Sequence, residues 1–188
     1  MQHWSRRLLF IAVLFVSLNV GCRSRSNTAT HSGTATSSSA AADYANAYKA
    51  LMISYRARIG ELTSRPLPPR SLPPEKKRAA LARQVDDVAD AYKGFASMLD
   101  ALHPPFLLQE VHSSTRSFFA VSADDTHRWA DAIRHGDRAA RTRAEHQLDA
   151  DSLGSLARMQ QALKRAGAGG QAQQMQGEID QVKREMGK

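Results

Sequence analysis

Apolar residues recur at helical spacing in four stretches between residues 44 and 163. The second stretch alternates steps of four and three without interruption, which is the a/d seam of a helix that packs along its whole length. The fourth is weak in its first half, where it holds only Ala140, Ala144 and Leu148. The pattern predicts four amphipathic helices, with apolar stripes Tyr44–Leu62, Leu81–Leu102, Leu108–Ile133 and Ala140–Leu163.

Helix-breaking residues stand between these stretches. Pro74 suits a first helical turn, Pro104 and Pro105 end the second helix, and Gly136-Asp137 offers a left-handed C-cap followed by an N-cap. We therefore expect helices over about 40–63, 74–103, 105–135 and 137–166. Because the connections are short, neighbouring helices should be antiparallel. The predicted fold is all-α, an up-down-up-down four-helix bundle over residues 43–166.

Composition agrees with an all-helical fold. Beyond residue 21 the chain has 29 Ala but only 9 Val and Ile together, which favours helices over strands. Residues 167–188 are rich in Gly and Gln, and Met175, Ile179, Val182 and Met186 form one thin helical stripe there. This tail could be a short helix that packs weakly at the edge of the bundle or docks on a partner helix.

The N-terminus has the layout of a signal peptide. Arg6 and Arg7 precede the apolar run Leu8–Val20. As a helix the run would span about 20 Å, which is less than the bilayer core of about 30 Å. Residues 1–21 are therefore predicted to be an export signal. Ser5-Arg6-Arg7-Leu8-Leu9-Phe10 also partly matches the twin-arginine pattern, so both export routes stay open.

The apolar run ends in Gly21-Cys22, and Cys22 is the only cysteine. Here the sequence resembles bacterial lipoprotein precursors, although Asn19 stands where their motif usually has an aliphatic residue. The resemblance implies cleavage before Cys22, lipidation of Cys22 (palmitate) and anchoring to a membrane of the cell envelope, in a leaflet that the sequence leaves open. The alternative is an ordinary signal peptide with a chance cysteine. Residues 22–42 then form a tether, because residues 23–42 include ten Ser or Thr and lack large apolar side chains.

Catalytic and cofactor motifs are absent from the sequence. It has no G-x-S-x-G, no phosphate-binding loop and no C-x-x-C-H, so we expect no catalytic residue, no cofactor and no metal ligand. His127, Asp131 and His135 step by four, but they lie opposite the apolar stripe and should face solvent. His112 and His146 are expected at the surface or rim of the bundle, and the carboxylate pairs Asp86/Asp87 and Asp124/Asp125 are expected to be solvated.

Four hydroxyl residues interrupt the apolar stripes of the third and fourth helices. Thr115, Ser122, Thr126 and Ser152 could line a polar cavity for a small ligand, or could bond the carbonyls of their own helices. The fold class alone does not decide between these two roles.

Charge is unevenly distributed. The chain carries a formal charge of +8, and residues 54–84 alone contribute +6. In an antiparallel bundle this segment forms one end, where Arg65, Arg70, Lys76, Lys77 and Arg78 could bind an anionic partner. Cell-wall polymer, lipid headgroups or an envelope protein would suit. Nucleic acid is disfavoured, because export removes it and no aromatic residue interleaves the basic run. A merely solvated basic surface is the alternative.

Together these patterns predict a membrane-anchored envelope lipoprotein whose bundle is a non-enzymatic binding or scaffolding module. The alternative is a bundle that binds a small ligand or a metal, including an enzyme whose site the sequence does not reveal.

Overall fold

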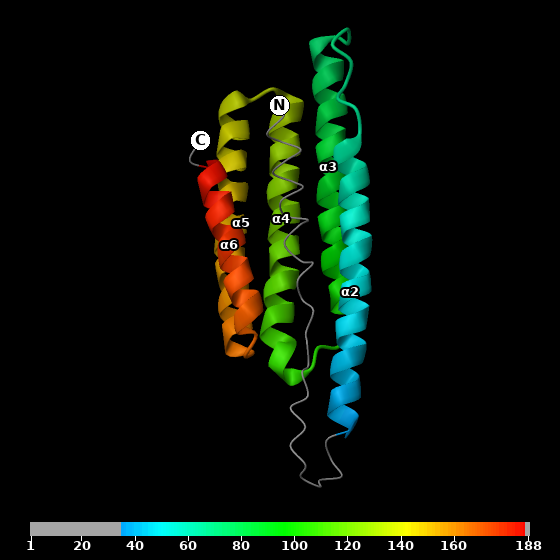
Figure 1. Cartoon of the computed structure of the whole chain (residues 1–188). Coiled ribbons are helices and arrows are strands. Elements are labelled where there is room, and N and C mark those ends of the chain that lie inside the picture. Colours follow the sequence, from blue (N-terminus) through cyan, green and yellow to red (C-terminus); the bar gives the residue numbers. More distant parts are fainter. Residues whose placement is uncertain (1–34, 187–188) are drawn as a thin grey trace.

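The computed structural model describes residues 35–186, and within this part the chain is helical and has no strand. Consecutive helices alternate in direction, as Figure 1 shows, so the fold is an all-α up-down bundle. Residues 1–21, predicted to be a signal peptide, and Cys22 lie outside the described residues. The elements are α2 (Ala35–Ser64), α3 (Pro74–Asp100), the 3₁₀ turn η1 (Phe106–Leu108), α4 (Gln109–His135), α5 (Arg138–Arg165) and α6 (Gly169–Met186).

Three helix boundaries differ from the prediction. α4 begins at Gln109 and not near residue 105, because residues 106–108 form the 3₁₀ turn η1. α2 begins at Ala35, inside the expected tether 22–42. Residues 40–42 are all Ala, the strongest helix former, which favours a helix there. α3 ends at Asp100 and not near residue 103. The reason is Pro104, which disfavours helical backbone at the residue before it.

The predicted turn between the third and fourth helices is confirmed. Gly136 adopts φ +71°, the left-handed conformation that ends α4. Asp137 then caps α5, because its Oδ1 accepts a hydrogen bond from the Ala140 backbone N–H at 2.8 Å. α3 likewise begins at Pro74, as predicted.

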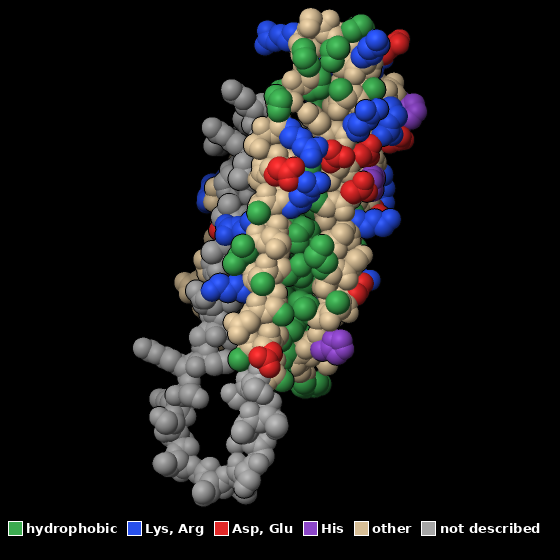
Figure 2. Space-filling view, turned by 90° about the vertical axis from the view of Figure 1, so that its right-hand side faces the viewer, with side chains coloured by type: hydrophobic (Ala, Val, Ile, Leu, Met, Phe, Trp, Pro, Cys, Tyr) green, Lys and Arg blue, Asp and Glu red, His purple; other side chains and the backbone are tan. Residues whose placement is uncertain are grey.

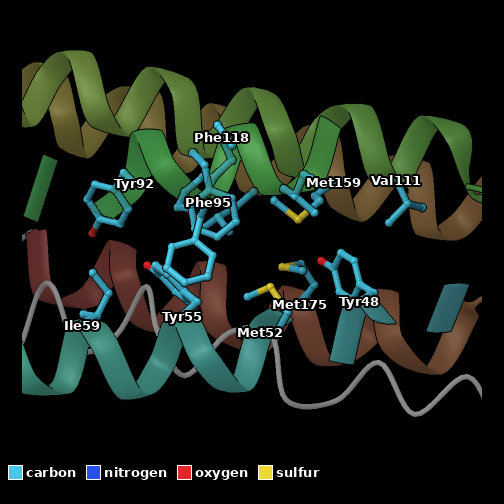
Figure 3. Packing of buried hydrophobic residues seen from close by; sticks show 14 of the residues in the cluster. Tyr48, Met52, Tyr55, Ile59, Tyr92, Phe95, Val111, Phe118, Met159 and Met175 are labelled. Atoms are coloured by element: carbon cyan, nitrogen blue, oxygen red, sulfur yellow. The ribbon is translucent and has the colours of Figure 1, made fainter. Parts of the chain in front are cut away.

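Aromatic side chains from three helices form the centre of the core. Tyr55 of α2 is fully buried, and its ring meets those of Phe95 and Phe119 edge to face, with centroids 4.6 and 4.8 Å away. Such edge-to-face pairs stabilise a core beyond the area they bury. Figure 3 shows this aromatic group beside a second region in which Met52, Met159 and Met175 gather from α2, α5 and α6.

The core continues into the predicted tail. α6 is a full helix of 18 residues that packs on α5, and Met175 and Ile179 are buried in the same cluster as Tyr55. Gln160 of α5 also donates to the Ala172 carbonyl at 3.1 Å. The bundle therefore extends beyond residue 166 and has five long helices in the described part of the chain. None of these helices has both the length and the apolar character needed to cross a bilayer.

Candidate functional site

The basic residues predicted to bind an anionic partner lie at one end of the bundle. The connection between α2 and α3 and the first turns of α3 form this end, opposite the first residue of α2, as Figure 1 shows. In Figure 2 most Lys, Arg, Asp and Glu side chains of the visible face gather toward the same end. The structure thus places the five residues at the end where the helix directions predicted them. We call this region, residues 65–78, the basic end.

The connection itself is tied to the helices it joins. The Leu72 backbone N–H donates to the Pro69 carbonyl at 3.2 Å, and the side-chain amide of Gln84 donates to the Pro66 carbonyl at 2.9 Å. Four prolines between residues 66 and 73 further limit its backbone freedom. The basic end is therefore a restrained surface, which loses less conformational entropy on binding than a free loop would lose.

Arg65 already has carboxylate partners. Its guanidinium binds Asp87 of α3 and lies 3.4 Å from Glu61 of α2. The hydrogen bond to Asp87 raises the pKa of Arg65 above its usual value, so the side chain stays charged. Its main contact joins the end of α2 to α3, and its charge is largely offset.

Arg78 packs against the turn between α4 and α5. A Cβ at Gly136 would lie only 3.3 Å from Arg78 Nε, which shows how closely the side chain crosses this turn. Arg78 is half-buried, and its Nε has no hydrogen-bond partner among the described residues. The contact brings α3 to the start of α5, where the exposed Arg138 adds positive charge that the sequence segment 54–84 did not include.

The remaining three basic residues are available for a partner. Arg70 and Lys76 are exposed and Lys77 is half-buried. Within the described part of the chain, no carboxylate lies at ion-pair distance from any of the three. The structure therefore divides the predicted set into two residues with roles inside the fold, Arg65 and Arg78, and three that project a free charge.

The interpretation of Asp124/Asp125 as a solvated pair is wrong for Asp125. Its side chain is 2% exposed, in the seam between α4 and α5, and its Oδ1 accepts a hydrogen bond from Arg128 at 2.7 Å. Burial, followed by the nearby charge of Asp151, raises the pKa of Asp125 to about 6. Asp125 lies seven residues from both Phe118 and Ala132, which are also buried, and this heptad spacing is a signal that could have located it.

The raised pKa gives a testable pH dependence. The folded state holds the Asp125 proton up to about pH 6, whereas the unfolded chain releases it near pH 3.9. The folded state therefore binds more protons in this window, and stability should fall as pH rises through it, by on the order of 1–3 kcal/mol. We expect Asp125→Asn to gain stability relative to the wild type between pH about 4 and about 7. Denaturant unfolding at pH about 4 and at pH about 7 measures the difference in free energy of unfolding between the variant and the wild type.

The matched control for this prediction is Asp124→Asn, because Asp124 is the exposed neighbour on the same helix. Its replacement should leave the wild-type pH dependence in place. A stability difference between Asp125→Asn and the wild type that stays the same at both pH values would contradict the assignment.

His112, expected at the surface or rim, is buried, and His127, expected to face solvent, is only partly exposed. His112 is 8% exposed, and its Nδ1 lies 3.1 Å from the Tyr44 hydroxyl of α2. Burial lowers the pKa of His112, which favours the neutral ring. His127 is only partly exposed and faces α3, with its Nδ1 3.1 Å from Asp86 and its Nε2 3.5 Å from Asp90.

The other two members of the histidine series remain exposed. Asp131 and His135 lie on the surface of α4, where Asp131 also pairs with Arg134 at 2.8 Å. Among the residues that the structure describes, no three His, Cys, Asp or Glu side chains converge in a way that could hold a metal ion.

All four hydroxyl residues of the predicted polar stripe are buried. The Thr115 hydroxyl donates to the Val111 carbonyl at 2.8 Å, which is the intrahelical bond named as the alternative to a cavity. The hydroxyls of Thr126 and Ser152, in contrast, have no hydrogen-bond partner in the described part of the chain.

Comparison with protein-family models, with curated proteins and with solved structures finds no match to this chain.

Proposed function

We propose that this protein is an envelope lipoprotein, anchored through a lipid on Cys22, whose helical bundle is a non-enzymatic binding module. The observation that carries the proposal is the direction in which α2 runs, from the end nearer Cys22 in the sequence to the basic end. α2 begins at the end that follows Cys22 in the chain, and the basic end lies at the other end of the same helix. A chain anchored at Cys22 can therefore present its free positive charges away from its point of attachment.

The partner we propose for the basic end is an anionic polymer or surface. Arg70, Lys76 and Lys77 carry three charges that no carboxylate of the described chain offsets. Each basic residue near an anionic lipid surface contributes about 1 kcal/mol, so three suffice for weak but measurable binding. The Pro-rich connection supports the proposal because it holds Arg70 in place before a partner arrives.

The test compares two triple variants of equal charge. Replacing Arg70, Lys76 and Lys77 by Gln should weaken binding to anionic wall polymer or anionic vesicles by roughly tenfold or more. Binding should also fall as salt rises from about 0.1 M to about 1 M, because the screening length drops from about 10 Å to about 3 Å. Co-sedimentation of the purified full chain with Cys22→Ala, which cannot carry the lipid, measures both effects.

The control replaces three exposed lysines elsewhere on the bundle, Lys49, Lys93 and Lys164, by Gln. This variant loses the same net charge but keeps the basic end. Equal weakening by the two triple variants would show that net charge and not this surface governs binding, and would remove the basic end from the proposal.

One observation favours a second candidate, a small polar ligand bound inside the bundle. The hydroxyls of Thr126 and Ser152 are buried without a partner, and a buried polar group without a hydrogen bond costs about 1–3 kcal/mol. A ligand or water molecule could satisfy them. A ligand-dependent rise in the thermal midpoint of the full chain that Thr126→Val removes would support this candidate.

A further inference from the structure

Two bulky apolar side chains project together from the end of the bundle opposite the basic end. Phe106 is 84% exposed and Leu107 is 71% exposed, and both lie in the 3₁₀ turn η1 that connects α3 to α4. Single exposed hydrophobic residues are common on protein surfaces. Two adjacent residues of this size that both point into solvent mark an interaction site more often. We call this pair the apolar tip.

The backbone holds the tip in place. Pro104 and Pro105 precede it, and the Leu108 N–H closes the turn on the Pro105 carbonyl at 2.8 Å. The side chains are therefore presented by a restrained turn, and they do not fold back onto the core.

The tip lies at the end from which the chain leaves toward Cys22. In Figure 1, the start of α2 and the connection from α3 to α4 are at the same end of the bundle. Twelve residues separate Cys22 from Ala35, so even a fully extended segment places Cys22 no more than about 45 Å from Ala35. A lipid on Cys22 therefore keeps the apolar tip within reach of the bilayer.

The carboxylates nearest the tip along the sequence are paired. Asp100 binds Arg116, with a second contact of 3.1 Å between Oδ2 and Nη2, and Glu110 lies 2.7 Å from Arg165 of α5. Each of these two negative charges is thus matched by an arginine. Pairing removes the repulsion that free carboxylates would meet at an anionic membrane surface.

We propose that Phe106 and Leu107 insert into the interface of the bilayer that carries the lipid on Cys22, and so hold the bundle upright. The inference rests on the lipid anchor of the proposed function. It also narrows the choice of partner for the basic end. α2, with 30 residues, is about 45 Å long. An upright bundle holds the basic end about that far from the headgroups, so its partner is cell-wall polymer and not the lipid surface.

The experiment uses the full lipidated chain in zwitterionic vesicles that contain nitroxide-labelled lipid. An environment-sensitive fluorophore is attached to Gln109→Cys, which is exposed beside the tip, or to Ser71→Cys, which is exposed at the basic end. We expect the nitroxide lipids to quench the label at position 109 severalfold more strongly than the label at position 71. Phe106→Ser together with Leu107→Ser should reduce the quenching at position 109 to the level at position 71.

Three results would overturn the inference. Equal quenching at both positions would show that the bundle does not stand on this end. Quenching at position 109 that survives the double substitution would show that the apolar tip is not what inserts. Protection of position 109 from aqueous iodide without quenching by nitroxide lipid would assign the tip to a protein partner or a second copy of the chain.

Dye stoichiometry separates failure of this inference from failure of the lipid anchor. Cys22 is the only natural cysteine, so a lipidated wild-type chain should take up no thiol-reactive dye. Dye uptake by the wild-type chain refutes the anchor, on which the inference rests. Absence of uptake together with equal quenching refutes the upright orientation alone.

Discussion

Leu99→Ala should lower the free energy of unfolding by about 2–5 kcal/mol. Leu99 is fully buried and belongs to the core cluster that joins α2, α3, α4 and α5. The truncation removes apolar contacts and leaves a cavity that the surrounding helices fill only in part. Denaturant unfolding followed by far-ultraviolet circular dichroism measures the loss.

The control is Met98→Ala, which truncates the preceding side chain on the same helical turn. Met98 is 50% exposed, so its loss should change stability by only about 0.5 kcal/mol. Similar losses for the two variants would contradict the packing of α3, as would a circular-dichroism spectrum dominated by strand.

Cys22→Ala should abolish both incorporation of radiolabelled palmitate and retention of the protein in the membrane fraction. The expectation follows from the position of the only cysteine at the end of the apolar run. No helix in the described part of the chain is long and apolar enough to span a membrane. The measurement is fractionation of labelled cells that express each variant at equal level.

Cys22→Ser is the companion variant, because serine keeps a side chain of similar size but cannot form the thioether. It should behave as Cys22→Ala does. Palmitate label that persists in either variant would place the lipid elsewhere or show that the label is not covalently attached at residue 22.

Local sequence signals predicted much of the fold. Gly136 and Asp137 ended one helix and started the next because each carries a specific backbone preference, left-handed φ for glycine and side-chain capping for aspartate. The a/d series of α3 is buried from Val85 to Leu99, and only its ends at Leu81 and Leu102 are partly exposed. Periodicity succeeds here because one face of α3 packs along its length.

Periodicity failed where a helix contacts several neighbours. α4 packs against α3 and α5 and also meets α2, whose Tyr44 and Tyr48 hydroxyls lie 3.1 and 3.5 Å from His112 and Thr115. The buried face of α4 is therefore wider than the single apolar stripe predicted for it. His112 and Asp125 lie at the edges of this wider face. A polar side chain at such an edge looks solvated in the sequence.

For the candidate site, too, the sequence predicted the location but not the individual contacts. Charge counting located the basic end, but the partners of individual residues depend on distant positions. Arg65 meets Asp87 across 22 positions, and Arg78 crosses the turn at Gly136. The apolar tip was missed for a related reason, since the large exposure of Phe106 and Leu107 follows from the path of the chain around two prolines and not from their composition.

Mass spectrometry of the N-terminal peptide of the protein recovered from membranes tests the central claim most directly. The account predicts a mature chain that begins at Cys22, with a thioether-linked diacylglycerol on its sulfur and an acyl group on its α-amino group. A membrane-recovered chain that begins at Met1 or at any other residue, or that carries an unmodified Cys22, would contradict it.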